Sequence, residues 1–225
     1  MHIYECPDGK KVPSVTTILQ IIGNKEIIYW ANRLGFKHID YETELNRLAD
    51  NGTLMHTVLQ HIVDPSLANE PIVFKDKFEE EKYLKLAEKF SNMIKNYSYT
   101  TIFTEKTFIS SKLGYGGTVD WFADMNGFNM INDFKSSKRV YMKQLLQIGG
   151  YYNLMIENGY SISGGSIILV NERIATLYPI NELSLIRLGE IFNYIYFVYQ
   201  NIIDEMIPYD NELLEKLKAR QELQQ

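Results

Sequence analysis

Residues 114–135, GYGGTVDWFADMNGFNMINDFK, decide the fold. Within this stretch, two runs that are rich in apolar residues, 118–125 and 128–134, lie on either side of Asn126-Gly127. An Asn-Gly pair favours the tight type I′ turn that joins two antiparallel strands, because both of its residues tolerate a positive φ. The stretch therefore predicts a β-hairpin.

Three charged side chains interrupt the apolar pattern of this hairpin. Asp133 and Lys135 project from the same face of the second strand, since side chains two positions apart in a strand share a face. The turn at Asn126-Gly127 places Asp120 roughly opposite Asp133. Two carboxylates at close range repel each other unless a cation lies between them, and oxygen donors favour Mg²⁺ or Mn²⁺. The pattern predicts a metal site at which Lys135 orients or helps to deprotonate a water molecule, with an ordinary exposed ion pair as the alternative.

The composition indicates one globular domain. With 225 residues, of which 45% are hydrophobic, the chain is long enough to bury one sizeable core. We expect a single domain over residues 1–225, with a mainly helical part at 1–98, a sheet core at 99–180 and C-terminal helices at 181–225. The expected fold class is α/β (α+β), with a central mixed β-sheet flanked by helices and a helical N-terminal layer.

Charge and cysteine content exclude several classes of protein. The formal net charge of −5 excludes a uniformly basic coat for nucleic acid, but it does not exclude a local basic groove. The single cysteine, Cys6, excludes a disulfide within the chain and a four-cysteine zinc or iron–sulfur site. The sequence has no signal-peptide core and no apolar run that could span a bilayer, so we expect a soluble cytoplasmic protein that binds no membrane.

Periodicity predicts the elements around the hairpin. The turn tripeptide Pro7-Asp8-Gly9 predicts a short N-terminal hairpin, and Ser14 is suited to cap the helix that follows. Apolar spacing predicts the remaining elements, which are helices at 51–63, 75–96 and 141–158, a strand at 100–110, a buried strand at 165–171, an edge strand at 175–180 that stops at Pro179, and one or two helices at 183–223 broken near Pro208.

Three features of these elements allow a structural and a functional interpretation. His56 lies on a mostly apolar helix face, where a core or boundary residue is commoner than a metal ligand. Glu105, the acidic residue of its strand, fits a solvent-facing position and a supporting role at the metal equally well. Trp30, Leu34 and Phe36 are interpreted as core packing of the helical N-terminal layer.

Further polar residues follow the hairpin. Ser136 and Lys138 directly after Lys135 are suited to phosphate contacts, although an ordinary exposed loop has the same composition. Gln147 and Tyr151 lie four positions apart on one helix face, and both end in groups that can bind a phosphate or order a catalytic lysine.

This set of residues resembles the motif of the PD-(D/E)XK nuclease superfamily. Asp133 follows Asp120 by thirteen positions, and Lys135 follows Asp133 by two. The RecB-like branch, which includes the mitochondrial genome-maintenance exonuclease and its bacterial and phage relatives, adds an upstream helical histidine and a downstream Gln-x-x-x-Tyr. The chain has both features, His56 in GTLMH and Gln147 to Tyr151 in QIGGY. The segment PSVTTIL at 13–19, followed by Trp30, also resembles the mitochondrial exonuclease, and the resemblance covers residues 13–152.

The resemblance implies a restriction-endonuclease-like core and a complete site. It implies catalytic roles for Asp120, Asp133 and Lys135, a metal held by His56, Asp120, Asp133 and the main-chain carbonyl of Phe134, and substrate contacts from Gln147, Tyr151, Ser136 and Lys138. The implied cofactor is Mg²⁺ or Mn²⁺. The four cysteines of iron–sulfur relatives are absent, so no iron–sulfur cluster is expected.

The function that the resemblance implies is a metal-dependent DNA exonuclease. It would hydrolyse phosphodiester bonds in single-stranded DNA or at strand ends, during replication, recombination or repair. DNA would be its main partner, and a helicase, a polymerase or a single-strand-binding protein is the kind of protein partner expected. The composition hints at a phage-encoded protein in a bacterial or phage-infected cytoplasm. Two alternatives remain open, a structure-specific or restriction-type endonuclease on the same fold and a non-catalytic DNA-binding module.

Overall fold

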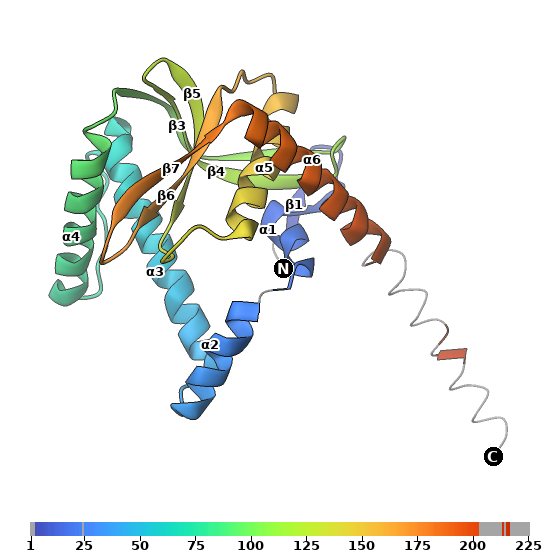
Figure 1. Ribbon diagram of the computed structural model, residues 1–225, viewed down its shortest axis with the longest axis horizontal. Helices are drawn as coiled ribbons and strands as arrows, with labels where there is room; N and C mark the ends of the chain where they lie inside the picture. The colour runs from blue at the N-terminus through green and yellow to red at the C-terminus, as the bar shows by residue number, and fades with distance from the viewer. Residues whose placement is uncertain (1–2, 24, 203–212, 214, 217–225) are drawn as a thin grey trace.

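The computed structural model describes residues 3–23, 25–202, 213 and 215–216. A five-stranded sheet with helices on both faces forms its centre, as the sequence predicts (Figure 1). In chain order the elements are β1 (Ile3–Glu5), β2 (Lys11–Pro13), α1 (Val15–Ile18), η1 (Leu19–Ile21), α2 (Lys25–Phe36), α3 (Tyr41–Val63), η2 (Pro65–Leu67), α4 (Lys77–Ile94), β3 (Tyr99–Ser110), β4 (Tyr115–Met125), β5 (Phe128–Lys135), α5 (Met142–Glu157), β6 (Gly164–Val170), β7 (Ala175–Asn181) and α6 (Glu182–Tyr199).

The predicted hairpin is the centre of this sheet. The strands lie in the order β3-β4-β5-β6-β7, with β5 and β6 parallel and the other neighbours antiparallel. Met125 pairs with Phe128, so Asn126 and Gly127 form a two-residue turn. Their φ angles are 53° and 85°, the positive values that an Asn-Gly hairpin turn requires. The sequence prediction of this hairpin is therefore confirmed.

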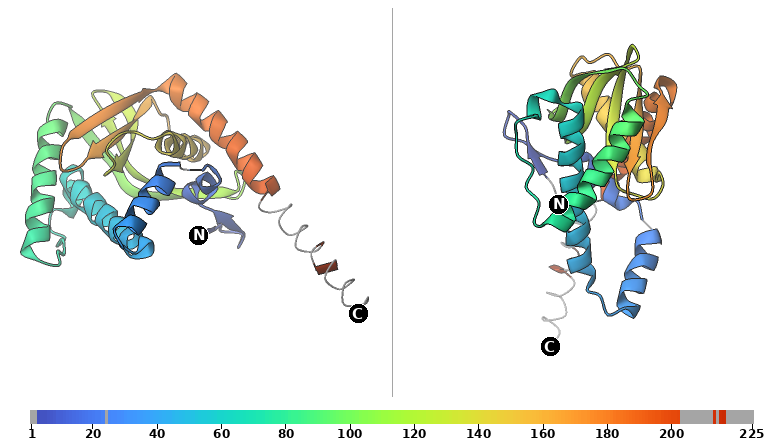
Figure 2. Two further views of the ribbon diagram at one scale, coloured as in Figure 1. Left: turned by 60° about the horizontal axis from the view of Figure 1, so that its bottom comes forward. Right: turned by 90° about the vertical axis from the view of Figure 1, so that its left-hand side faces the viewer.

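Helices pack on both faces of the sheet and form two separate cores (Figure 2). The apolar side chains of α1, α5 and α6 pack on one face, and those of α3 and α4 pack on the other. Gly149 allows α5 and α6 to approach closely, because a Cβ atom there would lie 2.5 Å from the Leu188 carbonyl carbon. The two helices therefore pack closely against each other on this face of the sheet.

The N-terminal segment attaches to β4. β1 and β2 form the predicted short hairpin, and Ser14 Oγ accepts a hydrogen bond from the Thr17 backbone N–H as the predicted N-cap of α1. Ser14 also forms a parallel bridge to Gly116 of β4. The cap thus fixes the start of α1 beside the strand that carries Asp120.

Several element predictions need correction. The helix expected at 51–63 begins at Tyr41, capped by the Asp40 side chain, and its first half extends away from the sheet beside α2 (Figure 1). β7 continues through Pro179, which is compatible with its edge position. Phe36 is 80% exposed and is not a core residue, whereas Leu34 is buried. The predicted break near Pro208 lies outside the described residues.

A fork opens between β4 and β5. Their pairing is recorded only from Trp121–Asn132 to Met125–Phe128. Beyond this point β4 continues along β3 to Tyr115, and β5 continues along β6 to Lys135. Asp120 and Asp133 are the first residues past the last pair, so the hairpin opens where the two carboxylates lie.

None of the described helices is long and apolar enough to cross a membrane.

Candidate metal centre

Asp120 bridges the two strands at the fork. Its Oδ2 accepts a hydrogen bond of 2.8 Å from the backbone N–H of Phe134 on β5. In a regular antiparallel pair this N–H would donate to a backbone carbonyl of β4. Because the Asp120 side chain accepts the hydrogen bond instead, the two strands can separate here. The residue is buried, and burial raises the pKa of its carboxyl group above the ordinary value, against the opposing effect of His56 and Lys135.

β3 and β4 are both distorted beside Asp120. Thr104 pairs with Trp121 and Lys106 with Val119, while Glu105 and Asp120 between them form no recorded pair. Val119 and Trp121 belong to the cores on opposite faces of the sheet, although residues two apart in a regular strand share a face. The regular alternation of side chains is therefore broken at this position.

Glu105 carries the backbone strain of this distortion. Its φ is 45°, which is uncommon for a residue other than glycine and usually needs support from the surrounding structure. The strained conformation brings Glu105 Oε1 within 3.6 Å of His56 Nδ1. The sequence allowed either a solvent-facing position or a supporting role for Glu105, and the structure places its carboxylate at the candidate site.

His56 reaches the fork from α3. Its Nε2 lies 2.9 Å from the carbonyl oxygen of Phe134, and Nδ1 lies 3.5 Å from Asp120 Oδ2. A carbonyl can only accept, so Nε2 carries the proton and Nδ1 faces the carboxylates of Asp120 and Glu105. Hydrogen bonding of one ring nitrogen to a carbonyl is how proteins orient a histidine whose other nitrogen binds a metal.

Asp133 and Lys135 form the second half of the site. Lys135 Nζ lies 2.6 Å from Asp133 Oδ2, as expected for neighbours two apart in a strand. Asp133 is fully buried, and among the described residues its oxygens have no hydrogen-bond partner apart from this ion pair. Burial raises the pKa of Asp133 to about 6, because the nearby Lys135 cation compensates only part of the desolvation.

The charged groups also shift the pKa values of the two bases. Burial favours neutral His56, but the Asp120 and Glu105 carboxylates outweigh it and raise the pKa of the imidazole. Burial likewise disfavours the Lys135 cation, but the carboxylates of Asp133 and Asp120 outweigh this effect and raise the pKa of the Lys135 ammonium group. Lys135 therefore keeps its proton, which favours an orienting and electrostatic role over that of a general base.

The donor atoms fit a divalent cation. His56 Nδ1 and one carboxylate oxygen each from Glu105 and Asp120 all lie within 4.8 Å of one another. Two hard oxygen donors and one imidazole nitrogen suit Mg²⁺ and, more readily, Mn²⁺. Buried Asp133 has Lys135 as its partner among the described residues, and its remaining lone pairs can accept further contacts. Asp133 is not part of the converging set, and Phe134 offers its carbonyl to His56, so their roles as metal ligands stay predictions.

Gln147 and Tyr151 lie one turn apart on α5 and contact each other. Gln147 Nε2 donates a hydrogen bond of 2.6 Å to Tyr151 Oη, and the tyrosine is buried in the core beneath α5. Its ring packs directly on Gly117 of β4, where a Cβ atom would lie 2.7 Å from Cε1. Burial, reinforced by the charges of Asp120 and Asp133, raises the pKa of Tyr151, which keeps its hydroxyl proton. Substrate contact by this pair remains a prediction.

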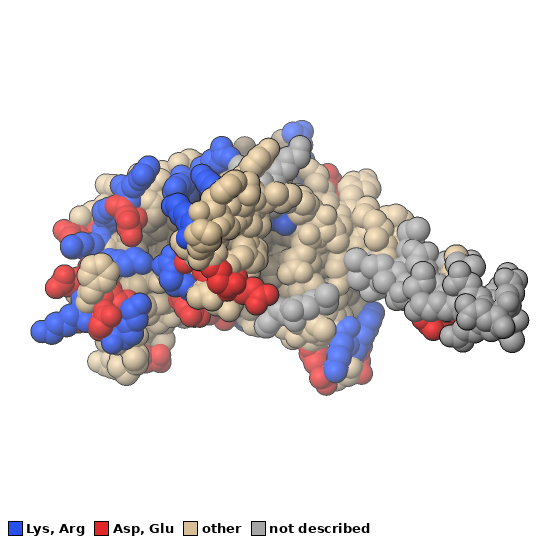
Figure 3. Space-filling view, turned by 90° about the horizontal axis from the view of Figure 1, so that it is seen from below, with Lys and Arg blue, Asp and Glu red and all other residues tan. Residues whose placement is uncertain are grey.

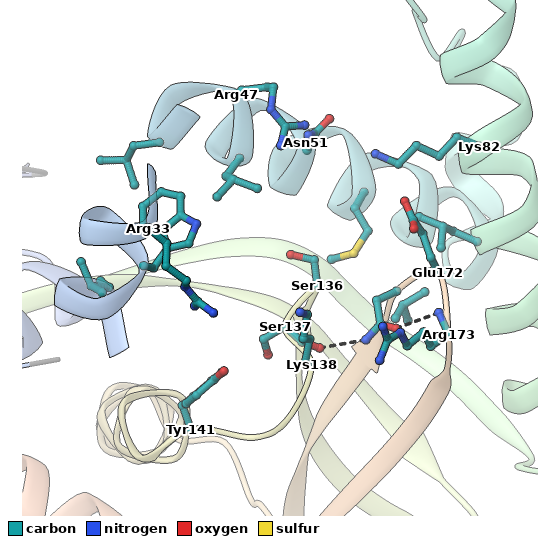
Figure 4. Close-up of a pocket in the computed structure, with 18 of the residues that line it drawn as sticks. Arg33, Arg47, Asn51, Lys82, Ser136, Ser137, Lys138, Tyr141, Glu172 and Arg173 are labelled. Carbon is teal, nitrogen blue, oxygen red and sulfur yellow. Dashed lines mark hydrogen bonds between the residues drawn. The ribbon is translucent and has the colours of Figure 1, made fainter. Parts of the chain in front are cut away.

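Ser136 and Lys138 project elsewhere, into a large cleft that begins beside the site (Figure 4). Trp30, which the sequence analysis assigned to the core, is partly buried and lines the same cleft together with Arg33, Lys82 and Arg173. Sequence reasoning missed these residues because they come from three separate elements and form no motif.

Comparisons with known proteins give little further information. No protein-family model and no curated protein matches the chain. Among solved structures, it is similar to the one described as "Crystal structure of SSO0001", with 14% sequence identity and a TM-score of 0.38 over 84% of this chain and 75% of that chain. A likeness at this level supports no inference about fold or function.

The geometry predicts that Glu105 binds the metal alongside His56. Glu105→Gln and His56→Ala should each weaken Mn²⁺ binding by about tenfold or more, since the first removes the charge of one oxygen donor and the second removes the imidazole nitrogen. Isothermal titration of the metal-free protein with Mn²⁺ measures this. Glu190→Gln, a matched change at an exposed position of α6, should leave the affinity unchanged. Wild-type affinity in Glu105→Gln would show that Glu105 is not a ligand.

Metal affinity should also depend on pH. A metal binds carboxylates and neutral imidazole, and the raised pKa values mean that Asp133 and His56 keep their protons to higher pH than free side chains. Affinity for Mn²⁺ should therefore rise with pH through about 6 and level off once His56 is neutral. Titration in two buffers of different ionisation enthalpy should show proton release near pH 6. Equal affinity at about pH 5 and pH 8 would contradict the assignment.

Proposed function

We propose that the chain is a metal-dependent DNA nuclease with a PD-(D/E)XK-type core, and that it acts as an exonuclease on single strands or strand ends. The observation that carries the proposal is the convergence of His56, Asp120 and Glu105 at the fork, beside the buried Asp133–Lys135 pair. The fork brings together residues from four elements, including all three that the resemblance treats as catalytic. An ordinary exposed ion pair would need neither burial nor a strained backbone.

The groups at the fork have complementary roles in phosphodiester hydrolysis. A divalent cation, when bound, supplies Lewis acidity and charge stabilisation for the phosphorus centre. His56, Glu105 and Asp120 would hold it, and the Phe134 carbonyl would keep His56 correctly oriented. Lys135, held as a cation by Asp133, would orient the attacking water and offset the negative charge that develops on the phosphate oxygens.

The preference for single strands is supported by the position of α3. This helix carries His56 at the fork and continues into the segment that, with α2, forms one wall of the adjoining cleft. A strand that leaves the fork along this wall would need to be unpaired for its bases to contact protein. In keeping with the resemblance, DNA is the proposed partner, and replication, recombination or repair is the proposed setting, in the cytoplasm of a bacterial or phage-infected cell.

The proposal predicts the behaviour of two variants. Asp133→Asn and Lys135→Ala should each reduce cleavage of end-labelled linear single-stranded DNA by about 100-fold or more in Mg²⁺ or Mn²⁺, because each removes a group that acts on the transition state. Both should keep the circular dichroism spectrum of the wild type. Lys112→Ala, at an exposed position between β3 and β4, serves as the control and should cut normally.

The same assay separates the alternatives. A closed circular single strand should resist cleavage if the chain requires an end, and cutting of the circle would replace the exonuclease with an endonuclease. Cleavage at the wild-type rate by Asp133→Asn or Lys135→Ala would refute the assignment of these residues to the catalytic site. Binding of DNA without cleavage of any substrate in either metal would favour a non-catalytic module.

A further inference from the structure

A cleft of about 1260 Å³ opens next to the metal centre. One wall is formed by α2 and the first half of α3, and the other by the loop after β5, the start of α5 and the turn between β6 and β7 (Figure 4). Met55 and Ser136, the chain neighbours of His56 and Lys135, both line it. The cleft therefore lies close to the candidate site.

The lining of this cleft is cationic, although the chain as a whole has a net charge of −5. One carboxylate, that of Glu172, lies among five cationic side chains, which are Arg33, Arg47, Lys82, Lys138 and Arg173. Over the left half of the face in Figure 3, positive and negative side chains lie next to one another. An excess of positive charge in this hollow is therefore a local property, and it suits a polyanion.

The cations come from opposite walls of the cleft. Arg33 extends from α2 towards Tyr141, and Lys82 extends from α4 across the other end (Figure 4). Arg33, Lys138 and Arg173 are exposed, whereas Arg47 is held by a two-pronged ion pair with Glu44. A row of exposed cations along both walls can follow successive phosphates of an extended chain.

Aromatic side chains accompany the cations. Trp30 and Tyr29 on α2 and Tyr141 at the start of α5 line the cleft. Trp30 is supported by an edge contact with Tyr41, with the ring centres 5.4 Å apart. The combination of positive charge and aromatic rings is how proteins bind unpaired nucleic acid, since any base can stack on an exposed ring.

We propose that this cleft holds a single nucleic-acid strand, with a base stacked on Trp30 and phosphates bound by Arg33, Lys138 and Arg173. The inference rests on the proposed nuclease function and extends it to the segment of substrate next to the phosphate that is cut. An acidic peptide would use the same cations, but it would gain nothing from a stacking position at Trp30.

Binding can be measured separately from cleavage. The probe is a fluorescein-labelled oligothymidylate of about 12 nucleotides, followed by fluorescence anisotropy of the full chain in EDTA, so that no strand is cut. Trp30→Ala should weaken binding by about tenfold or more, and Trp30→Phe should recover most of the loss. A plot of the logarithm of the binding constant against the logarithm of the salt concentration should have a negative slope. Arg33→Gln and Lys138→Gln should each make this slope shallower by about 0.7.

Matched controls lie on α6, away from the cleft. Tyr194→Ala and Arg187→Gln remove an exposed aromatic ring and a cation that do not line it, and both should bind like the wild type. A wild type that binds and cuts DNA, with all cleft variants binding equally well, would overturn this inference and leave the proposed function intact. Equal binding of Trp30→Ala and wild type, with displacement of the strand by polyglutamate, would instead assign the cleft to acidic peptides. A wild type that neither binds nor cuts would overturn both proposals.

Discussion

The hydrogen bond between Asp120 Oδ2 and the Phe134 backbone N–H is the contact on which the rest of the site depends. In a regular hairpin that N–H would bond to a carbonyl of the neighbouring strand. Here a carboxylate takes its place, the pairing of β4 and β5 ends, and each strand continues with its outer partner. The opening admits His56 from one side of the sheet and places Asp133 and Lys135 beside it. The interruption thereby brings the candidate metal ligands and the ion pair to one place in the sheet.

This arrangement is costly for the chain without a cation. Burial raises the pKa values of Asp120 and Asp133, so each ionises less readily than a free carboxyl group. The Lys135 cation compensates only part of the cost of burying the Asp133 carboxylate, and the positive φ of Glu105 adds backbone strain. Unfavourable features concentrated at one place are typical of functional sites, where stability is given up for chemistry. A bound divalent ion would offset the repulsion between the carboxylates.

The sequence predicted the parts of the fold that follow from local rules. Asn126-Gly127 specifies its turn through the positive φ values that these residues tolerate, and this fixes the register that brings Asp120 near Asp133. The N-cap at Ser14 and the buried strand of β6 also follow from local patterns. The position of Glu105 was only partly predictable. Its positive φ interrupts the strand, but the sequence of that strand alternates as in any regular strand. Apolar spacing alone cannot reveal such a distortion.

Trp30 shows a second limit of sequence reasoning. A tryptophan on an amphipathic helix is usually a core residue, but α2 packs beside α3 away from the sheet, and the ring lines the cleft instead. The cationic lining is equally hidden, since its members are spread from α2 to the turn between β6 and β7. Both depend on how distant segments meet, which residue spacing does not encode.

The most direct test of the metal centre is anomalous diffraction from crystals of the protein soaked in Mn²⁺. The account predicts one strong peak at the fork, at about 2.0–2.3 Å from His56 Nδ1 and from carboxylate oxygens of Asp120 and Glu105. A fork without a peak, with His56 still contacting both carboxylates, would contradict the assignment of these residues as a metal centre.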